Sequence, residues 1–204
     1  MIYTTQMLMN KYRDYTNPKS KIKRLCDEGK LIHISHGIYA DDLSISNVMA
    51  SSYIYGPSYV SFDYVLSSYS LISEFGLNVT CATFGKNKTK YYQTPKGLII
   101  YRDIPKKVFP YGVERKSVDG YVYFIATKEK AFCDYLYTRP YQATSIVDFK
   151  SYLFDDLRID IDEFELLDFN FIIKIAPLYK KKNFKYLVEY INKEVLQWMS
   201  ITIF

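Results

Sequence analysis

The chain has 204 residues, a mass of 24.1 kDa and a formal net charge of +5. Hydrophobic residues make up 49% of it and charged residues 24%, which is typical of a globular protein and excludes a disordered or fibrous chain. No apolar run approaches the roughly 18 to 20 residues that span a bilayer, and the first residues lack the apolar core of a signal peptide. We therefore expect no membrane association and a cytoplasmic location.

The first 40 residues predict two helices followed by a hairpin. After a first short helix, Asn17 can cap the free amides of a second one, and Pro18 suits its first turn. Gly29 supplies the left-handed conformation that ends a helix. Residues 31–34 and 38–40 then read as short strands around a tight turn.

The middle of the chain mixes helices with short β-rich runs. Helices are expected at residues 44–55, which Gly56-Pro57 ends, and at residues 62–72, whose apolar positions form one helix face. Short runs separated by hairpin-length turns predict an antiparallel sheet of three to five strands within residues 78–125.

The last third of the chain predicts helices. Thr127 starts one, and residues 145–200 read as three or four more, the last with an apolar stripe from Phe184 to Trp198. The apolar C-terminal tail, residues 194–204, is expected either to pack onto the core or to mediate a homodimer. The expected fold class is α+β, with an N-terminal domain at residues 1–40 and a mixed domain at residues 41–204.

Charge is segregated along the chain. Lys and Arg outnumber Asp and Glu by seven to three in residues 1–40 and by nine to two in residues 85–116, whereas residues 148–168 hold eight acids and two basic residues. Such segregation indicates faces with different partners, although solvated helices can also alternate in sign.

The second predicted helix carries its cations at the wrong end for helix stability. Its basic residues crowd the first two turns and its acids the last, whereas the helix dipole favours the reverse. With Ile22 pointing inward, helical spacing places Lys23 and Arg24 outward. The recognition helix of a winged helix-turn-helix presents cations in this way to bases and phosphates. An ordinary solvated helix and hairpin remains the alternative.

The candidate DNA-binding residues lie on this helix and on the hairpin, or wing, that follows it. They are Lys19, Ser20, Lys21, Lys23, Arg24, Lys30, His33, Ser35 and His36.

Three segments carry a resemblance to a known family. The sequences KIKRLCDEGKLIHISHGIYA, YIYGPSYVSFDYVLSSYSLI and YVYFIATKEKAFCDYLY follow one another as in the AbiEi antitoxins of abortive-infection type IV toxin-antitoxin systems. The chain resembles the short members of that family along nearly its whole length. The resemblance implies a winged helix-turn-helix, with residues 18–29 as the DNA-reading helix and residues 31–40 as the wing.

The same resemblance implies a function in phage defence. Such a protein is a transcriptional repressor that binds operator DNA containing inverted repeats and represses its own operon. Its domain at residues 41–204 counteracts a nucleotidyltransferase-like toxin without being an enzyme. The chain departs from the family where Ser35 and His36 stand in place of the usual basic wing residues. An antitoxin that binds its toxin directly, with little DNA binding, is the alternative.

Other candidate sites are less specific. A possible second basic surface, for nucleic acid, comprises Lys86, Lys88, Lys90, Arg102, Lys106 and Lys107. The acidic residues Asp155, Asp156, Asp160, Asp162 and Glu163 lack EF-hand spacing, so we interpret them as a solvated face or a surface for a basic partner. Cys26, Cys81 and Cys133 are expected to be free thiols. With only two histidines, the sequence predicts no metal, no cofactor and no catalytic triad.

Overall fold

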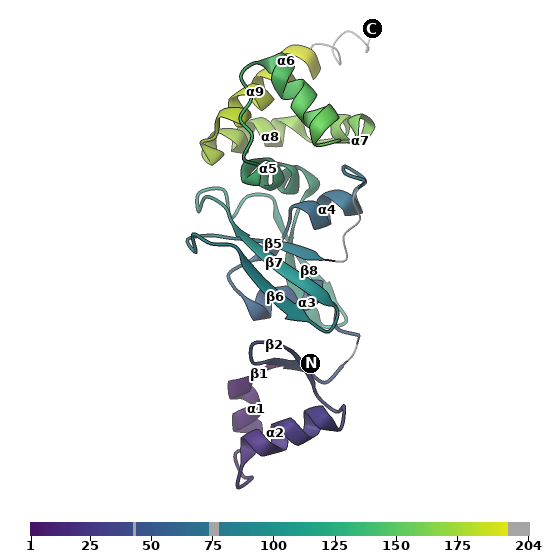
Figure 1. Ribbon diagram of the computed structural model, residues 1–204, viewed down its shortest axis with the longest axis vertical. Coiled ribbons are helices and arrows are strands. Elements are labelled where there is room, and N and C mark those ends of the chain that lie inside the picture. The colour runs from purple at the N-terminus through teal and green to yellow at the C-terminus, as the bar shows by residue number, and fades with distance from the viewer. Residues whose placement is uncertain (43, 74–77, 196–204) are drawn as a thin grey trace.

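The computed structural model describes residues 1–42, 44–73 and 78–195. Its parts follow one another along the long axis of the molecule: two N-terminal helices at one end, the larger sheet in the middle and the last helices at the other end (Figure 1). The fold is α+β with C-terminal helices, as the sequence predicted, and its N-terminal part holds a small antiparallel sheet. None of the described helices is both long and apolar enough to cross a membrane.

The N-terminal part combines two helices with a three-stranded sheet. Its elements are β1 (Ile2–Thr4), α1 (Thr5–Lys11), α2 (Pro18–Asp27), β2 (Ile32–Ser35) and β3 (Ile38–Ala40). The sheet has the order β1-β3-β2, and both of its strand pairs are antiparallel. The sequence did not predict β1, because its strand conformation depends on pairing with β3, which lies far along the chain.

Local signals set the ends of α2 as predicted. The side chain of Asn17 accepts a hydrogen bond from the Ser20 amide at 3.1 Å, and Pro18 occupies the first turn. Gly29 has φ +67°, the left-handed conformation that ends the helix. The β2–β3 turn has positive φ at both His36 and Gly37, as a type I′ hairpin turn requires.

The helices pack on the small sheet through an apolar cluster. Tyr3, Leu8, Ile22 and Leu31 are buried there, and Leu8 is inaccessible to solvent. Burying a Leu or Ile side chain contributes about 1.5–3 kcal/mol, so these contacts fix the orientation of α2 against the sheet. The sequence correctly predicted that Ile22 faces inward.

The central sheet differs from the prediction. It has six strands in the order β6-β7-β5-β4-β9-β8, and it is mixed, because β5 pairs in parallel with β7 and β4 in parallel with β9. The strands are β4 (Tyr59–Val60), β5 (Val79–Thr83), β6 (Lys90–Thr94), β7 (Gly97–Asp103), β8 (Val113–Val118) and β9 (Tyr121–Ala126).

The antiparallel prediction was wrong for two physical reasons. The hairpin β6–β7 folds back so that β7 lies between β6 and β5, a crossover that strand patterns do not reveal. In addition, β4 has only two residues and β8 is almost entirely exposed, so neither shows the apolar alternation of a half-buried strand.

Helices surround the sheet and form the C-terminal end. They are α3 (Asn47–Ile54), α4 (Asp63–Ser68), α5 (Lys128–Thr138), α6 (Ile146–Ser151), the π-helical turn η1 (Tyr152–Asp156), α7 (Ile161–Glu165), α8 (Phe169–Ile175), the 3-10 turn η2 (Ala176–Tyr179), α9 (Lys182–Tyr190) and the π-helical turn η3 (Ile191–Val195). One continuous apolar cluster joins the six-stranded sheet to the C-terminal helices. In Figure 1, α5 lies between these two parts.

A charged network lies inside this core. The Lys130 ammonium and the Asp134 carboxylate, one turn apart on α5, form an ion pair at 2.7 Å, and both side chains are fully buried. Asp134 also accepts hydrogen bonds from Tyr59 and Ser61, both at 2.8 Å, and from Tyr179 at 2.6 Å. Burial, and then the charge of Asp134, raise the pKa of Tyr59 and Tyr179 well above the usual value. The network therefore ties α5 to the sheet and to η2.

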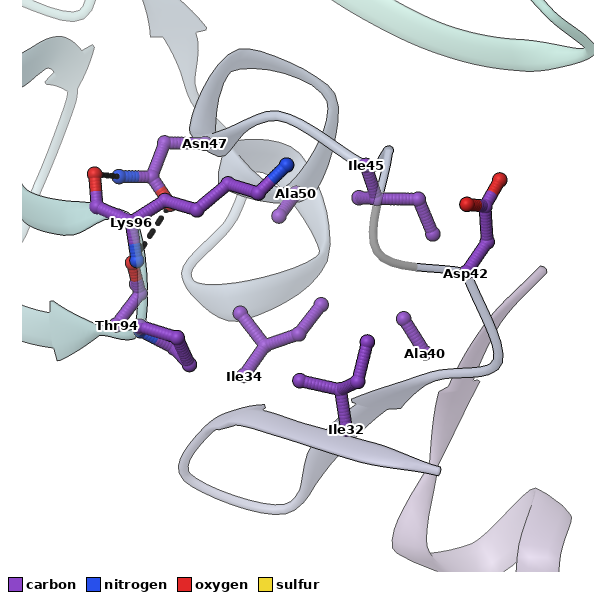
Figure 2. A pocket seen from close by; sticks show the side chains of 10 residues that line it. Ile32, Ile34, Ala40, Asp42, Ile45, Asn47, Ala50, Thr94 and Lys96 are labelled. Atoms are coloured by element: carbon purple, nitrogen blue, oxygen red, sulfur yellow. Dashed lines mark hydrogen bonds between the residues drawn. The ribbon is translucent and has the colours of Figure 1, made fainter. Parts of the chain in front are cut away.

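The small sheet also packs against the central part, across the predicted boundary at residue 40. An apolar cluster joins Ile34 and Ala40 of the small sheet to Ile45 and Ala50. These residues line a cavity of about 40 Å³ (Figure 2), beside which the Asn47 amide donates to the Lys96 carbonyl at 3.1 Å. The N-terminal part is thus held to α3 and to the β6–β7 turn.

Candidate nucleic-acid interface

A groove between α2 and the small sheet brings several predicted DNA-binding residues together. Lys19 and Lys23, one turn apart on α2, line it with His33 of β2. The other lining residues are Thr5, Ile22, Cys26 and Tyr39. The groove has a volume of about 360 Å³. Both lysines are exposed.

The electrostatics of the groove favour an anion. Among the residues that the structure describes, neither Lys19 nor Lys23 has an ion-pair partner, and the first turn of α2 holds no acid. The positive end of the helix dipole adds potential at the same end of the helix. Ser20, also exposed, lies between the two lysines in sequence.

The other predicted cations of α2 have local partners. Arg24 lies 3.5 Å from Glu28 and Lys30 lies 2.9 Å from it, and the hydrogen bond from Lys30 lowers the pKa of Glu28. Lys21 is half-buried, with its ammonium 4.9 Å from the centre of the Tyr15 ring. The available positive charge on α2 is therefore concentrated at its start.

The predicted wing residues face different surroundings. His33 is exposed beside the groove, where its ring lies 5.0 Å from that of Tyr39. Ser35 is buried, and its hydroxyl is 3.1 Å from Nδ1 of His36. The His36 ring packs edge-on against Tyr92 of β6, 4.7 Å away. The tip of the wing therefore contacts the central sheet, which the sequence did not indicate.

The possible second basic surface is only partly assembled. Lys88 and Arg102 line one cleft between the sheet and the C-terminal helices. Lys86 lies over the Tyr55 ring and Lys106 over the Phe84 ring, at 5.2 and 5.8 Å from their centres. The remaining members, Lys90 on β6 and Lys107 in the loop after β7, do not line that cleft.

Two other residues of this cleft were missed by sequence reasoning. Arg139 directly follows α5, and Lys181 directly precedes α9. They are 42 positions apart, and neither belongs to a recognisable motif. Only the packing of the C-terminal helices on the sheet brings them beside Lys88 and Arg102.

The remaining candidates have structural surroundings. Asp160 caps α7 by accepting from the Glu163 amide, and no group of three or more His, Cys, Asp or Glu able to hold a metal occurs within the described ranges. Cys81 and Cys133 are buried and Cys26 is half-buried, all as free thiols. Most of the predicted C-terminal tail, residues 196–204 including Trp198, lies outside the described residues.

Comparison with known proteins does not assign the chain to a family. No protein-family model matches the chain, and no curated protein is significantly similar to it.

Proposed function

We propose that the N-terminal part is a winged helix-turn-helix that binds DNA through the start of α2. The proposal is carried by the exposed Lys19 and Lys23, which line one groove with His33. The order of elements in residues 2–40, with a hairpin directly after the second helix, supports this proposal.

We further propose that the chain is a cytoplasmic antitoxin similar to the AbiEi family. In this role it represses its own operon, with operator DNA as its first partner. Residues 41–204 counteract a nucleotidyltransferase-like toxin, and the chain is not itself an enzyme. The three sequence segments that resemble the family support this proposal.

The DNA test uses the duplex directly upstream of the chain's own reading frame. Fluorescence anisotropy measures its affinity for the wild type and for a double variant, Lys19→Glu with Lys23→Glu. We expect the variant to lose at least about a hundredfold in affinity, because two phosphate-facing cations become anions, and to show a shallower salt dependence.

Two controls locate the effect. Lys174→Glu changes an exposed lysine of α8 and should leave the affinity unchanged. Arg24→Ala should reduce the affinity for DNA less than the double lysine variant does, because the Arg24 guanidinium already pairs with Glu28. Equal binding by the double variant and the wild type would show that α2 does not read DNA.

A second candidate function is an antitoxin that binds its toxin directly and binds DNA weakly. The contact of His36 with Tyr92 favours it, because the wing tip packs against the chain itself. Co-purification with the protein encoded by the neighbouring reading frame distinguishes the two. A stable stoichiometric complex supports direct binding, whereas neutralisation of toxicity without a complex supports the indirect mode.

A further inference from the structure

A basic cleft separates the central sheet from the C-terminal helices, far along the chain from α2. It has a volume of about 480 Å³. Four cations line it, each from a different segment: Lys88, Arg102, Arg139 and Lys181. A cleft of this size fits a small ligand, since small-molecule pockets commonly measure about 300–1,000 Å³.

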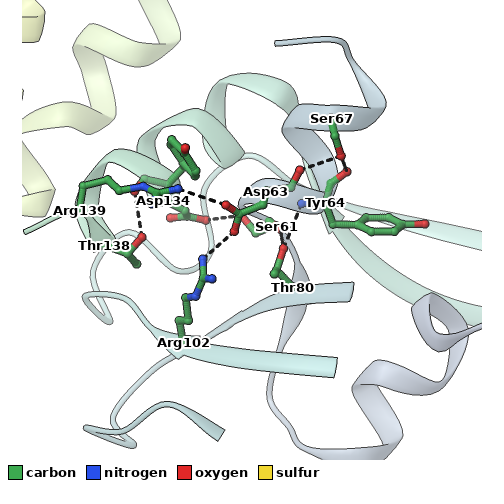
Figure 3. Close-up of polar contacts among 10 residues, drawn as sticks. Ser61, Asp63, Tyr64, Ser67, Thr80, Arg102, Asp134, Thr138 and Arg139 are labelled. Atoms are coloured by element: carbon green, nitrogen blue, oxygen red, sulfur yellow. Dashed lines mark hydrogen bonds and ion pairs between the residues drawn. The ribbon is translucent and has the colours of Figure 1, made fainter. Parts of the chain in front are cut away.

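The two arginines of the cleft are held in place by one shared carboxylate. Asp63, at the start of α4, accepts from Arg102 at 2.7 Å and from Arg139 at 3.2 Å (Figure 3). Both guanidinium groups also lie over aromatic rings, Arg102 over Phe62 and Arg139 over Tyr135. They are about one-third exposed, so they are fixed in position but still reach solvent.

The cleft has excess positive charge. Asp63 can balance only one of the two arginines that it contacts. The other carboxylate at the cleft, Asp103, uses one oxygen to accept from the Lys86 amide at 2.6 Å. Four cations against these two carboxylates leave a net charge of +2, which suits a dianion.

Lys181, on one wall of the cleft, lies in surroundings that favour contact with an anion. The Lys181 ammonium donates to the Tyr137 carbonyl, and it lies 4.6 Å from the centre of the Tyr137 ring. Burial lowers the pKa of Lys181, because the ammonium has lost part of its hydration. An anion in the cleft would replace that hydration, and the aromatic ring offers an apolar wall beside it.

We propose that this cleft binds the phosphate group of a small phosphorylated ligand of about mononucleotide size. A guanidinium held in place can donate two parallel hydrogen bonds to two oxygens of a phosphate. The lysines add positive charge without requiring a strict geometry. The inference goes beyond the proposed DNA binding and does not rest on it, since the groove of α2 contains none of these residues.

The test is isothermal titration of the full chain with inorganic phosphate, AMP and adenosine. We expect phosphate and AMP to bind and adenosine not to bind. If AMP binds more tightly than phosphate, the cleft takes a nucleotide, and equal affinities indicate recognition of the phosphate alone. If adenosine binds as tightly as AMP, the proposal is wrong. It is also wrong if neither phosphate nor AMP binds at about 10 mM, roughly ten times the upper end of the usual KM range of about 1 μM–1 mM.

Variants place the ligand in the cleft. Lys88→Ala removes an exposed side chain and should weaken AMP binding roughly tenfold, as expected for one charge-assisted contact. Arg139→Lys keeps the charge but removes the paired donors of the guanidinium, and should weaken AMP binding to a similar extent. Lys174→Ala is the matched control and should bind as the wild type does.

The outcome is independent of the DNA-binding proposal. Arg139→Lys should leave the affinity for the upstream duplex unchanged, and Lys19→Glu with Lys23→Glu should leave AMP binding unchanged. Normal AMP binding by both cleft variants would refute this site. Binding of a single-stranded oligonucleotide, but not of AMP, would likewise refute it in favour of a nucleic-acid surface.

Discussion

Replacing Asp134 by leucine should destabilise the protein severely. The change leaves the Lys130 ammonium in a fully buried site without its counter-charge. It also removes the acceptor for the hydroxyl groups of Tyr59, Ser61 and Tyr179. An uncompensated buried charge costs about 3–5 kcal/mol, which is comparable to the whole stability of many domains.

The partner substitution, Lys130→Met, should cost less. It removes the cation, but Asp134 keeps hydrogen bonds from three hydroxyl groups, which still solvate its carboxylate. We therefore expect a smaller loss, near the lower end of about 3–5 kcal/mol, because the carboxylate loses its counter-charge but stays hydrogen-bonded. The structure thus predicts an order, with Asp134→Leu worse than Lys130→Met.

Urea unfolding followed by far-UV circular dichroism measures both losses. Lys174→Met, which changes an exposed lysine on α8, should shift the free energy of unfolding by less than about 0.5 kcal/mol. The double variant completes a cycle whose coupling energy reports the pair itself. If Asp134→Leu unfolds at the same urea concentration as the control, or if Lys130→Met is the more damaging change, the network does not work as described.

Two further predictions concern titrating groups. Burial raises the pKa of Cys81 to about 12 and also raises that of Cys133, so a thiol reagent at pH 8 should label only the half-buried Cys26 in the folded protein and all three cysteines in urea. A bulky group on Cys26, which lines the α2 groove, should then block DNA binding, and DNA bound beforehand should slow the labelling of Cys26. Equal labelling of all three thiols in the folded protein would contradict the burial of Cys81 and Cys133. Because the pKa values of Tyr59 and Tyr179 are raised on folding, their contribution to stability is complete below the unfolded value of about 10 and is lost as the pH rises above it. The free energy of unfolding, measured from pH 8 to 11, should fall less steeply in Tyr59→Phe than in the wild type, and identical slopes would refute this linkage.

Local signals in the sequence determined the ends and the buried side of α2 in the N-terminal part. Asn17, Pro18 and Gly29 set the ends of α2, because capping and backbone freedom depend only on neighbouring residues. Helical spacing around Ile22 likewise predicted which side of α2 is buried. The candidate positions Lys19 and Lys23 could therefore be found from the sequence.

Tertiary structure alone decided how these pieces meet. The direction and order of the central strands depend on a crossover, and the contact of His36 with Tyr92 joins residues 56 positions apart, so no local pattern encodes either. The same is true of the basic cleft, where Asp63 aligns Arg102 and Arg139. The sequence by itself determined where helices begin and which cations are outward, since those depend on short-range chemistry. Which cations share a site was decided by the packing of the C-terminal helices on the sheet, because long-range burial sets those distances.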